Sequence, residues 1–359
     1  MSLYDLGGNV IGTDATAIKS AFIGLVASGD ISIGSVPGQT LGYNVSSAHY
    51  LTNGETQYEA MLEVYKTLDN AAIPFFISTD QHNGLVEYNR WANDLDKDGM
   101  EFANLNLGDT VSATDWDLFA SIESKTKLIK NYIGVPGNHE FMLPTGDDPD
   151  MPTPYIIKKT FFSTYPRTVL DANSDTYVCI DGLHNVKFVA SDNYWMNGSV
   201  MQNQALTGSF CEAVIAELSK DDFDIVFLQH WYPYAVASEL LYRDGTARTG
   251  YNPGGAPAIR TLLGARKTKS NGRVTDADGV SHAYDFRNMK HDLLCCLSGH
   301  MHLEMYGYLD GVLCYIADAI VHNTASCFGI VDRQNGLLRI WAWNDNEALA
   351  ELDLPLTQT

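Results

Sequence analysis

The sequence lacks the features that mark several classes of protein. No uninterrupted apolar stretch approaches the roughly 18 residues that a membrane-spanning helix needs, which argues against a membrane protein. Residues 1–5 contain no basic segment followed by an apolar run and a small-residue cleavage site, so we expect no secretory signal and a cytoplasmic location, with secretion left open as the alternative. There is no internal repeat and no low-complexity tract, so a repeat architecture is not expected.

Cysteine is scarce, and its spacing lacks the close CxxC pairs of a zinc knuckle or a small disulfide scaffold. We therefore expect reduced thiols that are mostly buried. Cys295 and Cys296 lie in an apolar run and are expected in the core. The six cysteines are at positions 179, 211, 295, 296, 314 and 327.

Positive charge is also scarce. The chain has 23 Lys and Arg against 44 Asp and Glu, a formal net charge of −21. A surface field of this sign repels nucleic acid and anionic membranes, because binding to either depends on Lys and Arg neutralising phosphates. Nucleic acid is therefore not an expected partner, and a nuclease is disfavoured.

One segment reverses this sign locally. Residues 240–291 hold a large share of the basic residues, and two interpretations stay open: a solvated loop, or a rim that guides anions toward a site. The basic residues are Arg243, Arg248, Arg260, Arg266, Lys267, Lys269, Arg273, Arg287 and Lys290.

The composition, 45% apolar and 19% charged in 359 residues, is typical of a globular protein with a sizeable core. Residues 1–50 are interpreted as an N-terminal arm with one amphipathic helix over 13–28, available for self-association or for docking to a partner. Residues 51–359 form the main domain, which begins with a helix over 55–69. Insertions are expected near 143–180 and 240–291.

Five short apolar runs follow, and each ends in residues able to bind a metal. Continuous apolar runs of this length predict strands buried on both faces, and open sheets with parallel strands place their ligand sites beyond the carboxyl ends of those strands. All five ends can therefore converge on one site. The runs cover residues 73–77, 102–107, 132–135, 224–228 and 293–297, and further strands of a closing sheet are expected at 313–316, 327–331 and 338–343.

The residues at these ends form a mixed oxygen and nitrogen ligand set, which suits Mn, Fe, Zn, Co or Ni rather than Ca. In His300-Met301-His302, extended backbone would place both imidazoles on one side, where they could serve two metals about 4 Å apart. Asp109, in a turn after Gly108, could bridge two ions with one carboxylate oxygen to each. The candidate ligands are Asp80, His82, Asp109, Asn138, His230, His300 and His302.

The order of these motifs resembles a known family, the calcineurin-like metallophosphoesterases. The family pattern D-x-H, G-D, G-N-H-[E/D], H and G-H-x-H is matched over roughly residues 72–345. Any single block is weak, whereas the five in order are highly specific. The matching blocks are Asp80-Gln81-His82, Gly108-Asp109, Gly137-Asn138-His139-Glu140, His230 and Gly299-His300-Met301-His302.

The resemblance implies an α+β fold: a four-layer αββα sandwich of two mixed β-sheets flanked by helices. It also implies two divalent or mixed-valent transition metal ions, with Mn, Fe or Zn favoured. Asp109 would bridge the two ions. The first ion would be held by Asp80, His82 and His302, and the second by Asn138, His230 and His300.

The implied reaction is hydrolysis of a phosphomonoester or phosphodiester by a hydroxide between the two ions, on a small phosphorylated substrate. His139 would be the general acid that protonates the leaving alkoxide, the alternative being a structural role. A structural role is expected for Glu140.

Two branches of the family fit the sequence poorly. Purple acid phosphatases resemble the family but have a Tyr ligand three positions after the bridging Asp, where this chain has Ser112, and they lack the histidine that is His82 here. Protein Ser/Thr phosphatases have Arg after the bridging Asp, where this chain has Thr110. Trp231, Tyr232 and Tyr234 could form an aromatic wall for a base or sugar, and packing in the core is the equal alternative.

Two further functions stay open beside the enzyme. A binding or structural protein could keep the fold and use residues 1–50 for assembly, although the complete ligand set argues against a dead enzyme. A nuclease would need a basic track beyond residues 240–291.

Overall fold

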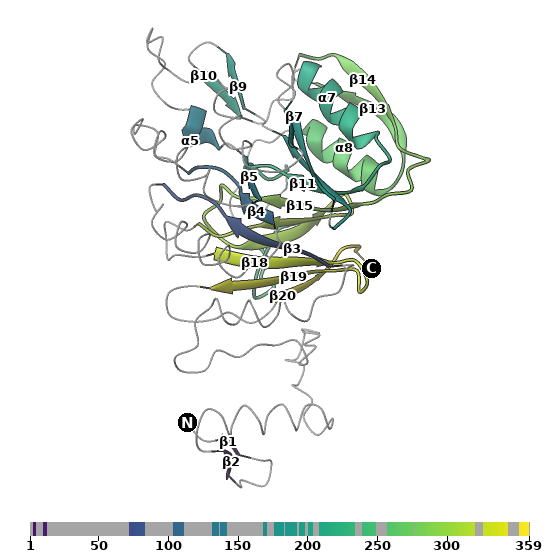
Figure 1. Cartoon of the computed structure of the whole chain (residues 1–359). Helices are drawn as coiled ribbons and strands as arrows, with labels where there is room; N and C mark the ends of the chain where they lie inside the picture. Colours follow the sequence, from purple (N-terminus) through teal and green to yellow (C-terminus); the bar gives the residue numbers. More distant parts are fainter. Residues whose placement is uncertain are drawn as a thin grey trace.

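The structure is a computed structural model of the whole chain (Figure 1). The residues that it describes are 3–4, 10–12, 72–82, 103–110, 131–135, 137–141, 168–170, 176–182, 184–191, 194–197, 200–203, 208–233, 239–248, 257–276, 278–319, 326–343 and 352–358.

One large sheet has six strands in the order β20-β19-β18-β3-β4-β5. Its second half is parallel, because β3, β4 and β5 run in the same direction. The other half is antiparallel and is built from the C-terminal part of the chain. The strands are β3 (Ala72–Ser78), β4 (Ala103–Asn106), β5 (Tyr132–Gly134), β18 (Ser326–Asp332), β19 (Leu337–Trp343) and β20 (Leu352–Pro355).

A second sheet has eight strands in the order β12-β16-β17-β15-β11-β8-β7-β6. Its centre is parallel, since β17, β15, β11 and β8 share one direction, and its outer strands are antiparallel. The strands are β6 (Thr168–Leu170), β7 (Thr176–Asp181), β8 (Val186–Ser191), β11 (Asp224–Leu228), β12 (Leu241–Tyr242), β15 (Leu293–Ser298), β16 (Met305–Leu309) and β17 (Val312–Ile316).

Smaller elements complete the described part of the chain. The helices there are α5 (Asn138–Phe141), α7 (Gly208–Leu218) and α8 (Pro257–Lys267). Three two-stranded sheets pair β1 (Leu3–Tyr4) with β2 (Val10–Gly12), β9 (Tyr194–Asn197) with β10 (Val200–Asn203), and β13 (Asn271–Thr275) with β14 (Ser281–Asp285).

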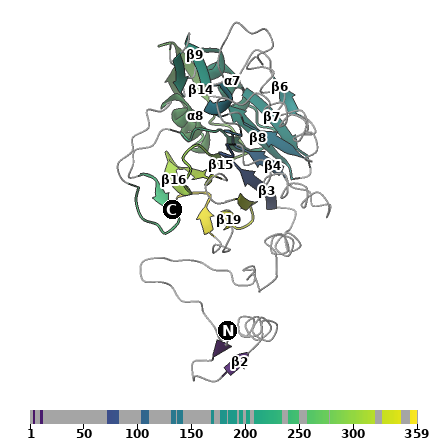
Figure 2. The ribbon, with the colours of Figure 1, turned by 90° about the vertical axis from the view of Figure 1, so that its left-hand side faces the viewer.

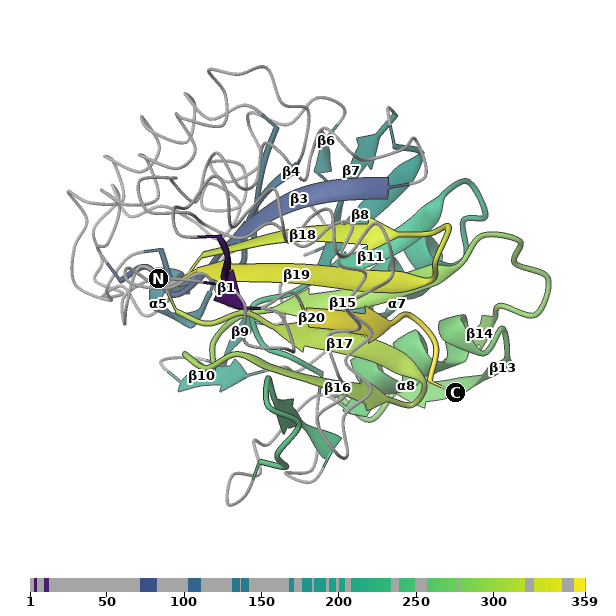
Figure 3. The ribbon, with the colours of Figure 1, turned by 90° about the horizontal axis from the view of Figure 1, so that it is seen from below.

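The two large sheets face each other across the main core, and α7 and α8 cover the outer face of the eight-stranded sheet (Figures 1 and 2). The alternation of side chains along a strand explains both contacts. In β11, Val226 and Leu228 point toward the six-stranded sheet, whereas Ile225 and Phe227 point toward the helices. Figure 3 shows the strands of one sheet lying across those of the other. The central strands are therefore buried on both faces, as their apolar runs predict.

This architecture confirms the expected α+β sandwich of two mixed sheets. In the described part of the chain, its helix layer covers the eight-stranded sheet. All five apolar runs that precede candidate ligands are strands, namely β3, β4, β5, β11 and β15. The predicted helices over 13–28 and 55–69 lie outside the described residues. None of the helices described here is long and apolar enough to cross a membrane.

The six cysteines are buried and free, as expected. The basic segment 240–291 is more ordered than a loop, since it contains α8 and the β13–β14 hairpin. Several of its cations pair with acids close by, which neutralises the local charge. These pairs are Arg260 with Glu239 and Asp310, Lys269 with Asp292, and Arg287 with Asp285.

The contact between β3 and β18 leaves no room for a side chain at Gly329. A Cβ there would lie 2.1 Å from Cε2 of Phe75, whose ring is fully buried between the sheets. We expect Gly329→Ala to lower the free energy of unfolding by about 1–3 kcal/mol, because the added methyl group overpacks the core. Urea denaturation would measure this. Thr275→Ala on exposed β13 is the control and should stay within about 0.5 kcal/mol of the wild type. Equal unfolding midpoints for Gly329→Ala and the wild type would contradict the packing.

Candidate metal centre

All seven predicted ligands lie just beyond the carboxyl ends of parallel strands. Three strands of the six-stranded sheet and two of the eight-stranded sheet contribute. Because the sheets face each other, these ends meet at one edge of the sandwich. Asp80 and His82 follow β3, Asp109 follows β4, Asn138 begins α5 after β5, His230 follows β11, and His300 and His302 follow β15.

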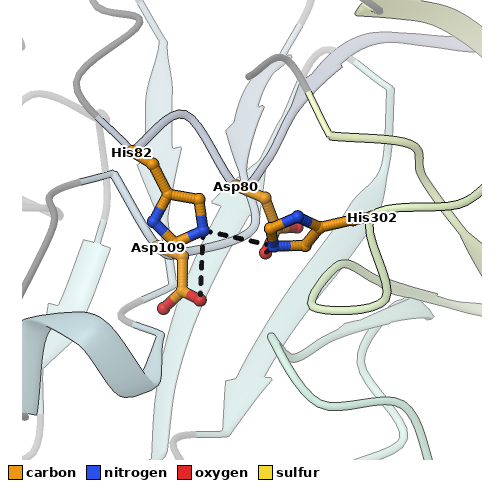
Figure 4. A group of neighbouring side chains, drawn as sticks. All are labelled: Asp80, His82, Asp109 and His302. Carbon is orange, nitrogen blue, oxygen red and sulfur yellow. Dashed lines mark hydrogen bonds and ion pairs between the residues drawn. The ribbon is translucent and has the colours of Figure 1, made fainter. Parts of the chain in front are cut away.

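The first group of candidate ligands is Asp80, His82, Asp109 and His302 (Figure 4). Nε2 of His302 lies 3.1 Å from Oδ1 of Asp80 and 3.2 Å from Nε2 of His82. Nε2 of His82 lies 4.0 Å from Oδ2 of Asp109. The donor atoms therefore point into one small space.

The second group is Asp109, His230 and His300. Nε2 of His230 lies 3.1 Å from Nδ1 of His300 and 3.2 Å from Oδ2 of Asp109. The amide oxygen of Asn138 joins this group at 3.2 Å from the same Nε2. Asp109 belongs to both groups, so the two candidate sites share one carboxylate.

These spacings fit metal coordination. Ions such as Zn²⁺ bind imidazole nitrogen and carboxylate oxygen at about 2.0–2.2 Å, which places neighbouring donors about 3.0–3.4 Å apart around the ion. The contacts of 3.1 and 3.2 Å within the two groups fall in this range. The combination of imidazole with carboxylate and amide oxygen suits a borderline transition metal.

The two carboxylate oxygens of Asp80 have different surroundings. Oδ2 accepts hydrogen bonds from the hydroxyl of Thr79 (2.7 Å) and from the backbone N–H of His300 (2.8 Å). Oδ1 is buried and faces Nε2 of His302 at 3.1 Å, but without the alignment of a hydrogen bond. A buried carboxylate oxygen without a hydrogen bond is costly, and a cation would satisfy it. The sequence pattern does not reveal Thr79 as the residue that orients this ligand.

Asp109 also uses its oxygens unequally. Oδ1 accepts the backbone N–H of His139 at 2.8 Å, whereas Oδ2 faces both groups. Oδ1 accepts one hydrogen bond from this N–H, and Oδ2 is the oxygen that lies near the nitrogens of His82 and His230. Oδ2 is the oxygen that the two groups share.

Most of the candidate ligands have an uncommon backbone conformation. Asp80, His82, Asp109, His300 and His302 all have positive φ, between 38° and 70°. The expectation of extended backbone at His300 and His302 is therefore wrong: both are in the left-handed region, and the turn itself directs one imidazole to each group. Non-glycine residues are uncommon in this region, and such strain concentrates at functional sites.

Glycine is required next to Asp109. Gly108 has a φ of 94°, and a Cβ there would lie 2.7 Å from both the backbone N of Gly137 and Nδ1 of His230. The β4 end can approach the β5 and β11 ends this closely only without a side chain at Gly108.

Neighbouring groups fix the orientation of both imidazoles of the second group. Nδ1 of His230 donates to the carbonyl oxygen of Leu107 at 2.6 Å, which directs Nε2 toward Asp109. The indole of Trp231 stacks on His300, with ring centroids 3.5 Å apart and planes 27° apart. Trp231 and Tyr232 are buried, which favours packing over an aromatic wall for a substrate, and Tyr234 lies outside the described residues.

Charges in the second group shift its pKa values. Burial lowers the pKa of His230, but the carboxylate of Asp109 outweighs burial and raises that pKa to about 9. Burial raises the pKa of Asp109, whereas the charge of His230 lowers it well below its usual range. Burial, followed by repulsion from His230, lowers the pKa of His300 to about 3. Without an ion, His230 and Asp109 therefore form an ion pair near neutral pH, and His300 is neutral.

The first group is less strongly perturbed. Burial lowers the pKa of His82, and the carboxylate of Asp80 raises the pKa of His302. His139 lies beside this group, with its ring centroid 4.4 Å from that of His82 and its Nε2 3.8 Å from Oδ2 of Asp109. Its side chain is 30% exposed, so it borders the centre on the solvent side.

Two facing mixed sheets with ligand groups at their parallel strand ends define the metallo-dependent phosphatase fold. The family model of calcineurin-like phosphoesterases matches residues 73–304, which is more than half of the chain. The chain belongs to the calcineurin-like phosphoesterase family, a family of hydrolases that act on phosphoester bonds.

The solved structures to which the chain is similar share little sequence with it. A Staphylococcus aureus protein assigned as a 5′-nucleotidase, in complex with α-ketoglutarate, is 12% identical (TM-score 0.43; 80% of this chain, 55% of that one). A 5′-nucleotidase precursor from Thermus thermophilus is 13% identical (TM-score 0.35; 80% and 55%). An archaeal phosphodiesterase is 12% identical (TM-score 0.32; 76% and 100%). The chain thus spans about half the length of the two nucleotidases. No curated protein matches it.

The raised pKa of His230 predicts how metal binding depends on pH. In the metal-free protein this imidazole keeps its proton below about pH 9, and the proton competes with a metal for Nε2. We expect the affinity of the second group for Mn²⁺ to rise by up to about tenfold per pH unit between about pH 6.5 and about pH 8.5, with release of a proton. Titration calorimetry in buffers of different ionisation enthalpy would measure both.

His282→Ala provides the control. His282 pairs with Asp276 at 2.7 Å on the β13–β14 hairpin, so its removal should leave the pH dependence unchanged. An affinity that does not change over this pH range, or binding without proton release, would contradict the ion pair between His230 and Asp109.

Proposed function

We propose that this protein is a phosphoesterase with two transition metal ions, which hydrolyses a phosphomonoester or phosphodiester. The observation that carries the proposal is the pair of ligand groups that share Oδ2 of Asp109. Membership of the calcineurin-like phosphoesterase family supports it. The donor set favours Mn, Fe or Zn.

In this proposal each ligand group holds one ion. Asp109 serves both through Oδ2, which leaves Oδ1 in its hydrogen bond with His139 N–H. Two bound cations would lower the pKa of water in the centre and neutralise charge on the phosphoryl oxygens. The first ion is assigned to Asp80, His82 and His302, and the second to Asn138, His230 and His300.

His139 is assigned as the general acid. Its backbone N–H is fixed to Asp109, while its partly exposed ring has Nε2 directed toward the shared oxygen. A phosphate ester bound at the two groups would lie within reach of this nitrogen, and its negative charge would favour the imidazolium. Nε2 then donates its proton to the leaving alkoxide as the P–O ester bond breaks, while the attacking water, which loses a proton to solvent, forms the new P–O bond.

The substrate is proposed to be small. The net charge of −21 opposes binding of a long polyanion. Cations of residues 240–291 that could have formed a basic track, including Arg260, Lys269 and Arg287, pair with acids instead. Both observations favour a small phosphorylated molecule over nucleic acid.

Removal of the acid is the direct test of the role of His139. We expect His139→Ala to lower kcat for phenyl phosphate by about 10²–10⁴-fold, because a poor leaving group needs a proton. The loss should be much smaller for p-nitrophenyl phosphate, whose leaving group departs as a stable anion. Metal content, measured by elemental analysis, should stay at the wild-type level.

His184→Ala is the matched control, since His184 also pairs with a carboxylate, that of Asp181 at 2.6 Å, in the turn between β7 and β8. It should retain wild-type activity on both esters. If His139→Ala hydrolyses phenyl phosphate as fast as the wild type, the acid role fails.

Stereochemistry tests the direct transfer to water. Because the proposal involves no covalent enzyme intermediate, one displacement should invert the configuration at phosphorus. A substrate with a chiral phosphorothioate group, hydrolysed in isotopically labelled water and analysed by phosphorus NMR, would report the outcome. Net retention would require two displacements and would exclude this mechanism.

A further inference from the structure

A buried network of polar side chains lies next to the turn that carries His300 and His302. The guanidinium of Arg243, in the turn after β12, grips Glu304 with two donors, Nε to Oε2 and Nη2 to Oε1 (2.7 Å). The hydroxyl of Tyr315 donates to Oε1 of the same carboxylate at 2.6 Å. The side chain of Arg243 is 21% exposed and that of Glu304 is 10% exposed, whereas Tyr315 is fully buried.

The network joins elements that hold both ligand groups. Glu304 is two residues after His302, immediately before β16. Tyr315 lies in β17, and its hydroxyl is 3.3 Å from Sγ of Cys327 in β18 of the other sheet. Cys327 pairs with Ile77 of β3, the strand that leads to Asp80. The carboxylate of Glu304 is therefore tied to both sheets close to the ligands.

Contacts at both ends hold the strained turn that carries His300 and His302. At its start, the N–H of Gly299 donates to the carbonyl oxygen of His230 (2.9 Å), and the N–H of His300 donates to Asp80 (2.8 Å). At its end, Glu304 is held by Arg243 and Tyr315. The left-handed backbone at His300 and His302 persists only if the surrounding structure determines it.

We propose that Arg243, Glu304 and Tyr315 are positioning residues, which fix the turn so that His300 and His302 face their separate ligand groups. This inference rests on the proposed metal-dependent function. It also gives Arg243 a role other than contact with a substrate anion. The guanidinium fork matches both carboxylate oxygens in one plane, so the pair sets an orientation that a single contact would not.

The choice of charged residues supports positioning over stability. A buried ion pair must overcome the cost of removing both charges from water, and well-packed apolar residues in its place are often as stable or more so. Stability alone therefore does not explain the partly buried ion pair of Arg243 with Glu304. What it supplies is a defined geometry at Glu304, two residues from a ligand.

The test separates stability from metal binding. In the triple variant Arg243→Met, Glu304→Met and Tyr315→Phe, apolar groups replace the whole network, and no buried polar partner within the triad remains unpaired. We expect an unfolding midpoint in urea equal to or above that of the wild type, measured without metal. Affinity for Co²⁺ should nevertheless fall by about 10–100-fold, as when partners that orient metal ligands are lost. The visible absorption of bound Co²⁺ should change as well.

Glu304→Gln is the second variant, since it keeps the shape of the side chain and removes its charge. It should bind Co²⁺ more weakly than the wild type and more strongly than the triple variant. This variant decides the question if the triple variant does not fold.

Arg260→Met is the matched control. Arg260 grips two carboxylates, those of Glu239 and Asp310, in the same forked way, but none of the three is a ligand or adjoins one. Its removal should leave Co²⁺ affinity and absorption unchanged.

The outcomes also separate this inference from the proposed function. Wild-type affinity and absorption for Co²⁺ in the triple variant, or in Glu304→Gln if the triple variant does not fold, would overturn the positioning role. A wild-type protein that binds Co²⁺ tightly but hydrolyses no phosphate ester would overturn the proposed function. Weakened Co²⁺ binding in the variants would still support the positioning role in that case.

Discussion

The centre depends on one hydrogen bond, from the backbone N–H of His139 to Oδ1 of Asp109. By occupying Oδ1, it turns Oδ2 toward both groups of donors. The bond requires a very close approach of chains, because a Cβ at Gly137 would lie 2.2 Å from Oδ1. It also ties the position of His139 to that of the shared carboxylate. The candidate acid and the candidate bridge are thus placed by the same contact.

Without a cation, burying the charged groups around this hydrogen bond costs free energy. Asp80, Asp109 and His230 are each at most 1% exposed, so charge is removed from water at three neighbouring positions. The ion pair of Asp109 with His230 compensates for part of this cost, whereas Oδ1 of Asp80 has no aligned donor. Folding places the groups there because strands β3, β4 and β11, buried on both faces, end at this edge. The apolar sheets therefore provide the energy that assembles a polar centre.

The sequence predicts the ligands and the strands before them better than it predicts the rest. β11 is fully apolar after its first residue, and His230 is the second residue after its end, so a simple pattern identifies both. Strand β16, which lies next to the edge strand β12, alternates between buried and half-buried positions and carries no ligand, and the pattern does not reveal it. The edge strand β12 depends on pairing with β16, which is distant in sequence.

The sequence alone also does not predict the backbone conformation of the candidate ligands. His300 and His302 suggest an extended pair, because positive φ is uncommon in residues other than glycine. The hydrogen bond from the His300 N–H to Asp80 holds that backbone, and it comes from the tertiary structure. Likewise, 61 residues separate Arg243 from Glu304, so no local pattern links them.

The left-handed backbone of the ligands has a consequence for how the centre can change through evolution. Asp, Asn and His are the residues besides glycine that most readily adopt this conformation, and they are also the residues that donate oxygen and nitrogen to metals. At Asp80, His82, Asp109, His300 and His302, backbone and ligand chemistry therefore select the same side chains. A β-branched residue would strain this backbone and would also remove the metal-binding donor. Glycine would relieve the backbone but remove the donor, so relatives that have lost the metal centre should accumulate glycine or asparagine at these positions.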